Sequence, residues 1–171
     1  MLRQISSRDH RLMRRVNTWL PPRWVRFWAL AASRAGDGWI WSFFGVLLLA
    51  FGEERGLAAD LAGLFSAAVS IALFQLLKRL AGRKRPCQVQ PHCWATLLPP
   101  DQFSFPSGHS MTAFAVTVPL ALYFPALLPA LLFCALSVAA SRVLLGMHFV
   151  SDVVAGCVLG ALIGYATYFS L

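Results

Sequence analysis

Charged residues are scarce in this sequence. Only 13% of the 171 residues are charged, whereas 58% are hydrophobic. This composition is too apolar for an ordinary soluble domain of the same length. Because one membrane-crossing helix needs about 20 mostly apolar residues, we expect a single membrane domain over residues 1–171 with little chain outside the bilayer.

Acidic residues are fewer still, with seven against fifteen Lys and Arg and a formal net charge of +8. Such an excess would suggest nucleic-acid binding in a soluble protein, but here the basic residues form two clusters and predict no nucleic-acid partner. Residues 1–21 form a basic flank whose first fifteen residues lack the apolar core of a secretory signal, so the membrane segments are expected to be permanent. This flank is expected to be cytoplasmic and attracted to anionic headgroups. The amino-terminal cluster comprises Arg3, Arg8, Arg11, Arg14, Arg15, Arg23 and Arg26.

Long uncharged stretches predict an all-α, polytopic membrane helix bundle with about six transmembrane helices. Residues 110–141 carry no charge, and a single helix of that length would rise about 48 Å, well beyond the roughly 30 Å hydrocarbon core. Two helices with a turn near Pro125 fit better. The other uncharged stretches are 39–52, 61–77 and 153–171, the last with Gly156, Gly160 and Gly164 at a spacing that allows close helix packing.

The first expected helix decides the orientation. Residues 22–33 are apolar but contain Arg23 and Arg26, so they form either a short spanning helix or an interfacial amphipathic one. If they span, the amino terminus lies opposite the long loop at 81–106, between helices 3 and 4. The loop and the site would then face the periplasm or exterior of a bacterial inner membrane. If they do not span, the amino terminus moves to the other side.

That loop contains prolines and two cysteines but no helical periodicity. Cys87 and Cys93 are six residues apart. A disulfide is plausible if the loop faces an oxidising compartment, and two reduced thiols are an equal alternative.

A second basic cluster, Lys78 to Arg85, indicates phosphate chemistry. Displacement at phosphorus spreads charge over three equatorial oxygens, which fixed cations and N–H donors must match. Lys78, Arg85 and Arg142 can supply the cations. Ser107 and Gly108, behind Pro106 at a helix start, can supply free N–H groups at the positive end of the helix dipole.

Two histidines can carry out the catalytic steps. His148 and Asp152 are four residues apart, so they share one helix face, and the carboxylate can hold the imidazole in one tautomer. We therefore predict His148 as the nucleophile and Asp152 as the residue that orients it. His109 would protonate the departing oxygen and then activate water. This face carries three cations and only two carboxylates, Asp101 and Asp152. A divalent metal ion would therefore find few ligands and strong repulsion there, so neither metal nor cofactor is expected.

These segments resemble the signature of the type-2 phosphatidic acid phosphatase superfamily, Lys-x6-Arg-Pro, Pro-Ser-Gly-His and Ser-Arg-x5-His-x3-Asp. Every specified position matches, from Lys78 to Asp152. The resemblance implies phosphate binding by the first and third segments, His148 as the nucleophile and His109 as the acid and base. It also implies six helices, with the site near the outer surface in bacteria.

The expected function is metal-independent hydrolysis of a lipid phosphate or diphosphate through a phosphohistidine. Polyprenyl diphosphate, phosphatidylglycerophosphate, phosphatidate and a lipid A phosphate are all candidates. Transfer of the phosphate to another lipid is the enzymatic alternative, and a transporter or lipid-binding module is the non-enzymatic one. The bilayer and the lipid substrate are the only partners the sequence indicates, and no obligate protein partner is inferred.

Overall fold

A computed structural model describes residues 2–89, 91–95 and 101–171. The described chain is helical and holds no strand apart from an isolated bridge between Lys84 and Phe103. The expected loop at 81–106 includes residues 90 and 96–100, which lie outside the described part. The helices are α1 (Leu2–Thr18), α2 (Arg23–Ala35), α3 (Trp39–Phe51), α4 (Glu53–Ala81), α5 (Pro86–Val89), α6 (Gly108–Tyr123), the 3-10 turn η1 (Pro125–Leu127), α7 (Leu128–Leu144) and α8 (Val150–Ser170).

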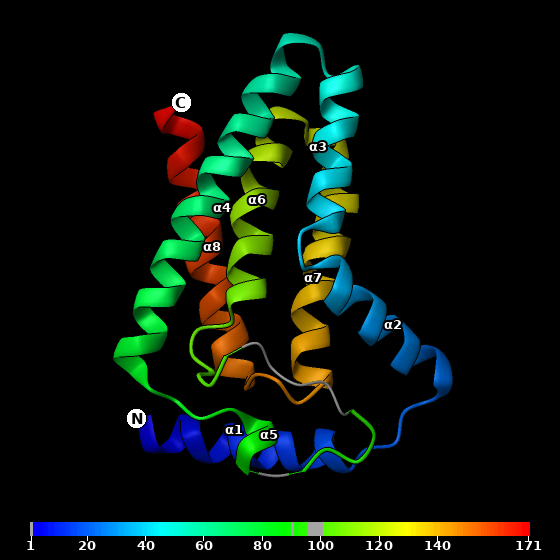
Figure 1. Cartoon of the computed structure of the whole chain (residues 1–171), viewed down its shortest axis with the longest axis vertical. Helices are drawn as coiled ribbons and strands as arrows, with labels where there is room; N and C mark the ends of the chain where they lie inside the picture. Colours follow the sequence, from blue (N-terminus) through cyan, green and yellow to red (C-terminus); the bar gives the residue numbers. More distant parts are fainter. Residues whose placement is uncertain (1, 90, 96–100) are drawn as a thin grey trace.

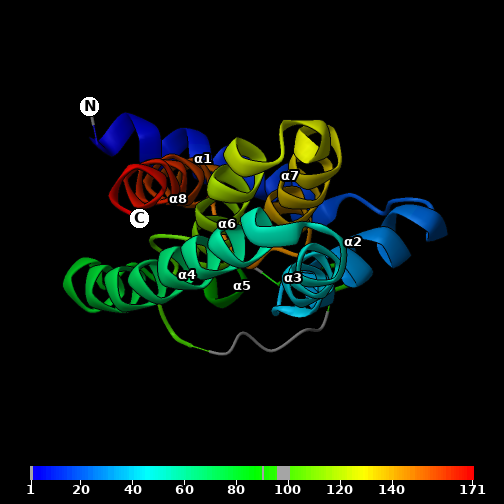
Figure 2. The ribbon, with the colours of Figure 1, turned by 90° about the horizontal axis from the view of Figure 1, so that it is seen from above.

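Helices α3, α4, α6, α7 and α8 run along the long axis of a bundle (Figure 1). Seen from above, α6 lies between α4 and α8 (Figure 2), and it also packs on α7. Among the described residues, α4, η1 with α7, and α8 are long and apolar enough to cross a membrane, and α3 is a shorter apolar helix. Large apolar side chains such as Leu64 and Phe133 are exposed on the bundle surface. The protein is therefore a multi-pass membrane protein, as the sequence predicted.

The uncharged stretch at 110–141 folds back on itself. Helix α6 ends at Tyr123, η1 makes the turn at Pro125–Leu127, and α7 returns beside α6. Proline at the start of the turn cannot continue the α6 hydrogen-bond ladder, because it has no N–H. The predicted hairpin is confirmed, and it brings the start of α6 and the end of α7 to the same end of the bundle.

The glycines of α8 allow the backbone of this helix to pack directly against the backbone of α6. A Cβ at Gly156 would lie 2.6 Å from the Ser107 carbonyl oxygen, and one at Gly160 would lie 2.1 Å from the Met111 carbonyl oxygen. Those atoms belong to the backbone of α6 and of Ser107 just before it, so they cannot rotate away. The predicted packing role of the glycine stripe is confirmed.

Replacing Gly160 with valine should destabilise the bundle and lower activity indirectly. The added atoms have to push α6 and α8 apart, and overpacking of this kind costs about 1–3 kcal/mol. The melting temperature in detergent should fall for Gly160→Val and stay unchanged for Val158→Leu, since Val158 faces outward on the same helix and is exposed. Equal melting temperatures would show that α6 and α8 are not in close contact.

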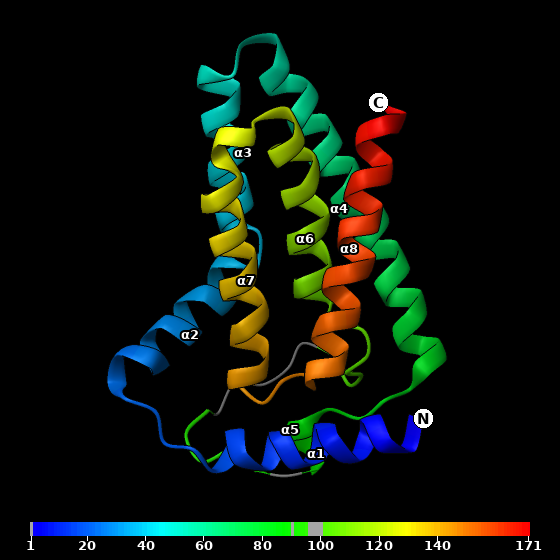
Figure 3. The ribbon, with the colours of Figure 1, turned by 180° about the vertical axis from the view of Figure 1, so that it is seen from behind.

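The amino-terminal segments differ from the arrangement in which residues 22–33 span. Helix α2 has 13 residues, a rise of about 20 Å that falls short of the roughly 30 Å core, and it lies obliquely to the bundle (Figure 3). The structure therefore favours the interfacial alternative for this segment.

Helix α1 lies across the end of the bundle where α4 and α7 finish and where α6 and α8 begin (Figures 1 and 3). Asp9 of α1 pairs with Arg83 at 2.8 Å, and the Cys93 N–H donates to the Asn17 carbonyl oxygen at 3.0 Å. The flank at 1–21 and the described part of the loop at 81–106 therefore share one end of the molecule. This corrects the expectation that they lie on opposite sides, because α2 lies obliquely to the bundle and does not run along its axis (Figure 3).

Candidate active site

The three motif segments meet at the end of the bundle that α1 covers. Arg85 Nη1 lies 3.1 Å from His148 Nε2. Both Lys78 and Arg142 act electrostatically on His148 and on His109. The structure thus places both histidines beside the same cations, although α6 and α7 separate them in the sequence.

His148 is held as a neutral imidazole with one nitrogen facing the cations. Its side chain is buried, and Nδ1 lies 2.7 Å from the Ser104 carbonyl oxygen. Arg85 has donors only, so Nε2 accepts from Arg85 and Nδ1 carries the hydrogen that goes to Ser104. Burial, followed by the charges of Arg85, Arg142 and Lys78, holds the pKa of His148 well below its usual value of 6.5. Nε2 therefore carries the lone pair of the ring, which accepts from Arg85 in this structure and lies among the cations of a site built for an anion.

Asp152 does not hold His148 directly. Its Oδ2 lies 4.0 Å from His148 Nδ1 and accepts instead from the Ser104 hydroxyl and from the Phe149 N–H, the latter at 2.9 Å. The carboxylate fixes Ser104, whose carbonyl oxygen in turn fixes His148. The predicted orienting contact is thus corrected to an indirect one through Ser104.

Arg83 anchors this carboxylate from the other side. Its Nη1 donates to Asp152 Oδ1 at 2.5 Å and its Nη2 donates to Asp9 Oδ2 at 2.8 Å. Its guanidinium also lies over the Phe149 ring, 4.1 Å from the centroid. Sequence reasoning counted Arg83 only as part of a basic cluster and missed the role of Ser104. Asp9 of helix α1 thus helps to hold the Arg83 side chain that contacts Asp152.

Arg85 and Lys78 share one carboxylate, that of Asp101. Arg85 Nη2 donates to Asp101 Oδ1 at 2.7 Å, and Lys78 Nζ donates to Asp101 Oδ2 at 2.5 Å. Partial burial raises the pKa of Asp101, but the hydrogen bonds from Lys78 and Arg85 outweigh it and lower the pKa below its usual value. The carboxylate is therefore ionised at neutral pH and occupies donors that a phosphate would use.

Replacing Asp101 with asparagine should tighten the binding of vanadate, an anion that mimics pentacoordinate phosphorus. The vanadate concentration for half-inhibition should fall about tenfold, since the anion no longer displaces a charged competitor from Lys78 and Arg85. Weaker inhibition would instead show that Asp101 positions these cations for the anion.

Arg142 brings a third cation to the site. It is buried; Nη1 donates to Ser33 Oγ at 2.5 Å and Nη2 donates to Met147 Sδ at 3.1 Å. Its Nε has no hydrogen-bond partner among the described residues. A buried guanidinium with an unused donor is costly unless a ligand completes it, which suits an anion site.

The start of α6 presents backbone donors to the same region. The Ser107 N–H donates to the Asp152 carbonyl oxygen at 3.0 Å, which docks this turn on α8. Gly108 opens the helix, and the N–H groups of a first helical turn have no intrahelical acceptor. A Cβ at Gly108 would lie 3.2 Å from the Phe74 ring, so glycine also permits close packing on α4. Gly108 thus lies at a helix start, as the phosphate-binding prediction requires, whereas the Ser107 N–H is already used by the Asp152 carbonyl oxygen.

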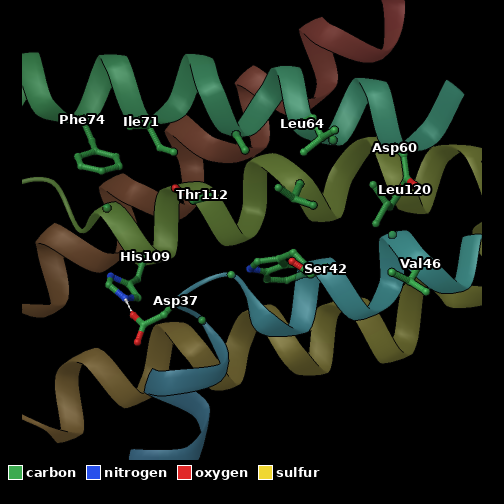
Figure 4. Close-up of a pocket in the computed structure, with 18 of the residues that line it drawn as sticks. Asp37, Ser42, Val46, Asp60, Leu64, Ile71, Phe74, His109, Thr112 and Leu120 are labelled. Carbon is green, nitrogen blue, oxygen red and sulfur yellow. Dashed lines mark hydrogen bonds and ion pairs between the residues drawn. The ribbon is translucent and has the colours of Figure 1, made fainter. Parts of the chain in front are cut away.

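His109 pairs with a carboxylate that sequence reasoning missed. Its Nε2 lies 2.6 Å from Asp37 Oδ1, in the turn between α2 and α3 (Figure 4). Asp37 stands between Gly36 and Gly38, and no motif marks it. Only the fold brings that turn to the start of α6.

A largely apolar cavity of about 630 Å³ opens beside His109 and Asp37. It runs between α3, α4 and α6 to Asp60, deeper in the bundle (Figure 4). Its walls include Trp41, Val46, Leu64, Ile71 and Phe74. Such a lining suits a hydrocarbon chain.

The family model described as the PAP2 superfamily matches residues 61–170. The chain belongs to the PAP2 superfamily. The match contains every position of the three motifs, and it confirms the resemblance inferred from them.

Relatives and solved structures agree with this membership. Over 130 residues the chain is 38% identical to decaprenylphosphoryl-5-phosphoribose phosphatase of Mycobacterium tuberculosis, covering 74% of this chain and 68% of that protein. It is 39% identical over 101 residues to lipid A 1-phosphatase of Rhizobium johnstonii, covering 57% of this chain and 41% of that protein. The chain therefore spans about two fifths of that relative's length. The crystal structure of a transmembrane PAP2-type phosphatidylglycerolphosphate phosphatase from Bacillus subtilis superposes with a TM-score of 0.72 at 26% identity, covering 96% of this chain and 84% of that one.

Proposed function

We propose that this membrane protein hydrolyses a lipid phosphate or lipid diphosphate through a phosphohistidine, without a metal ion. The observation that carries the proposal is the buried, neutral His148, whose Nε2 faces Arg85 beside Lys78 and Arg142. An imidazole lone pair aimed into a cluster of cations is arranged to attack an anionic electrophile. Membership of a superfamily whose relatives here carry the names of phosphatases supports the same reaction.

In the first step, His148 Nε2 attacks phosphorus and the bond from phosphorus to the lipid oxygen breaks. His109 gives its proton to that departing oxygen, while Arg85, Lys78, Arg142 and the first turn of α6 stabilise the equatorial oxygens. In the second step, His109 takes a proton from water, which attacks the phosphohistidine and releases inorganic phosphate. His148 is regenerated, with Asp152 and Ser104 keeping its tautomer fixed.

The substrate is proposed to be a lipid because the apolar cavity begins at His109. A headgroup phosphate bound among the cations would leave its hydrocarbon chain next to Trp41, Ile71 and Phe74. The relatives' names make a lipid-linked phosphosugar, lipid A, a polyprenyl diphosphate and phosphatidylglycerophosphate the compounds to compare.

The location is proposed to be the inner membrane of a bacterium, since the named bacterial relatives are membrane phosphatases or act on membrane lipids. A periplasmic site is expected from the family resemblance, which implies a site near the outer surface in bacteria, and from a helix count that placed the amino terminus opposite the loop. That count loses its support, because α1 and the loop share one end of the bundle.

Phosphate release from purified protein tests the proposal. Each lipid phosphate is supplied alone in mixed micelles, with and without chelator, and inorganic phosphate is measured. We expect turnover of at least one lipid, unchanged by chelator and inhibited by vanadate. Strict dependence on a divalent ion would contradict the metal-free mechanism. Phosphate release that needs a second lipid as acceptor would favour phosphotransfer, and transport with no turnover of any lipid would favour the non-enzymatic alternative.

A further inference from the structure

One ionisable side chain inside the bundle has no part in the proposed reaction. Asp60 belongs to α4, a helix long and apolar enough to cross the membrane, and it lines the apolar cavity that begins at His109. Among the described residues, no hydrogen bond or ion pair reaches its carboxyl group. A carboxyl group in a membrane helix costs free energy unless a partner binds it, so it marks a candidate functional site.

Asp60 lies far along the cavity from the cations of the active site. Figure 4 shows His109 toward one end of the cavity and Asp60 beside Leu120 toward the other. Leu120 packs on Gly63, one turn after Asp60 on α4, where a Cβ would lie 2.9 Å from Leu120 Cδ1. Leu120 follows His109 by eleven residues on α6, which is a rise of about 16 Å. A group that reaches Asp60 from a phosphate bound among the cations therefore belongs to the hydrocarbon chain of the lipid.

A glycine of α3 leaves room for this carboxyl group. A Cβ at Gly45 would lie 3.2 Å from Asp60 Oδ1 and 3.6 Å from Asp60 Oδ2, so a side chain at this position would press on the carboxyl group. Asp60 is half-buried and lines the cavity together with Gly45. Its carboxyl group is therefore accessible to a ligand in the cavity.

A hydrogen-bond donor lies one helical turn away on α3. Trp41 precedes Gly45 by four residues, so the two share one face of the helix. Trp41 lines the same cavity and is 9% exposed, and its Nε1 has no hydrogen-bond partner among the described residues. Buried indole N–H groups usually have a partner. The walls of the apolar cavity thus hold an acceptor and a donor that no other described residue satisfies.

We propose that Asp60 and Trp41 form a polar subsite that binds a hydroxyl group on the hydrocarbon chain of the lipid, an inference that rests on the proposed function. A hydroxyl group can satisfy both side chains, because it donates to a carboxyl oxygen and accepts from an indole N–H. A carboxyl oxygen accepts such a bond whether or not the group is ionised. An ammonium group on the chain would suit Asp60 alone, since it has donors only and leaves the Trp41 N–H without an acceptor.

The subsite selects lipid phosphates whose chain carries a hydroxyl group partway along its length. A site that hydrogen-bonds a substrate hydroxyl rejects the analogue that lacks it, because the buried polar groups of the site are then left unpaired. Asp60 and Trp41 touch the chain and not the reacting atoms. They act on binding that is equal in the ground state and the transition state, so their effect appears in KM rather than in kcat.

Alkyl phosphates of equal chain length test the subsite. One of them has a plain chain, and the others carry a single hydroxyl group at successive carbons from near the phosphate to the end of the chain. Phosphate release in mixed micelles gives kcat/KM for each compound. We expect the largest preference at an intermediate position, at least about tenfold over the plain chain and due to KM. No preference, or the same preference at every position, would overturn the proposal.

Variants of the two side chains separate hydrogen bonding from packing. Asp60→Leu offers no acceptor and should remove the preference, whereas Asp60→Asn keeps an acceptor and should retain part of it. Trp41→Phe keeps an aromatic ring without the N–H and should lower the preference about threefold. Glu54→Leu makes a matched exchange at an exposed carboxylate of α4 outside this cavity and should leave the preference unchanged. An Asp60→Leu protein that melts like the parent and keeps the full preference would overturn the proposal, and Trp41→Phe tests the subsite independently if Asp60→Leu does not fold.

Binding of the same compounds to immobilised His148→Asn protein repeats the comparison without turnover. We expect the same preferred hydroxyl position there, and its loss when Asp60→Leu is added. Preferential binding together with no phosphate release by the parent protein would refute the proposed function and leave the subsite standing. Equal turnover and equal binding of all the compounds would refute the subsite alone.

Discussion

Replacing His148 with asparagine should abolish phosphate release from every lipid substrate. Asparagine can keep a hydrogen bond to the Ser104 carbonyl oxygen, but it offers no nitrogen lone pair that can attack phosphorus. Loss of a covalent nucleophile removes the two-step route itself, so we expect turnover to fall by at least about 10³-fold. Phosphate release and acid-labile, base-stable labelling of the protein by radioactive substrate measure the two consequences.

The control for this variant is His10→Asn. His10 lies at the same end of the bundle and contacts the Phe149 ring, but it has no proposed part in the reaction. Turnover should stay within about threefold of the parent, since only a peripheral ring contact is lost. A His148→Asn protein that is folded in detergent and still becomes labelled would remove His148 from the mechanism.

The pH dependence of the reaction should reflect the environment of His148. A nucleophilic imidazole has to be neutral, and burial together with Arg85, Arg142 and Lys78 holds the pKa of His148 well below 6.5. Protonation of His148 should therefore not limit kcat/KM between pH 7 and pH 6. An ordinary histidine with a pKa of about 6.5 would lose about two thirds of its neutral form over that interval.

The motif residues could be predicted from the sequence because their chemistry is local. The run Pro106, Ser107 and Gly108 predicts a helix start that can bind an anion. The i, i+4 spacing of His148 and Asp152 predicts that they share one helix face. The hairpin was likewise predictable, since 32 uncharged residues cannot fit one crossing of the membrane.

The supporting residues were not predictable, because their partners are far away in the sequence. Asp37 reaches His109 across 72 positions, and Asp9 reaches Arg83 across 74. Ser104 acts on His148 through its backbone carbonyl oxygen. The identity of the side chain does not indicate such a role, so the sequence could not predict it. The placement of α1 depended on whether α2 spans, and the sequence of that segment, with arginines among its apolar residues, left this open.

Replacing His109 with asparagine should slow the hydrolysis of lipid phosphates by about 10²–10⁴-fold, the usual contribution of a positioned acid or base. An aryl phosphate, whose leaving group needs no proton, should still phosphorylate His148. The second step should then fail for lack of a base to activate water, so the phosphoenzyme accumulates. A burst of about one equivalent of the aryl alcohol, followed by slow turnover, is the expected result in a rapid-quench measurement.

Asp37→Asn separates the acid–base role of His109 from a structural one. The amide keeps the size of the side chain and can still hydrogen-bond Nε2 of His109, but it no longer stabilises the imidazolium that must form when His109 takes a proton from water. Turnover should fall in the same direction as for His109→Asn but less, by about tenfold, and part of the phosphoenzyme should again accumulate. Full turnover with no accumulation would show that the 2.6 Å contact between Asp37 and His109 only fastens the α2–α3 turn to α6, and that the phosphate and its cations alone set the protonation of His109.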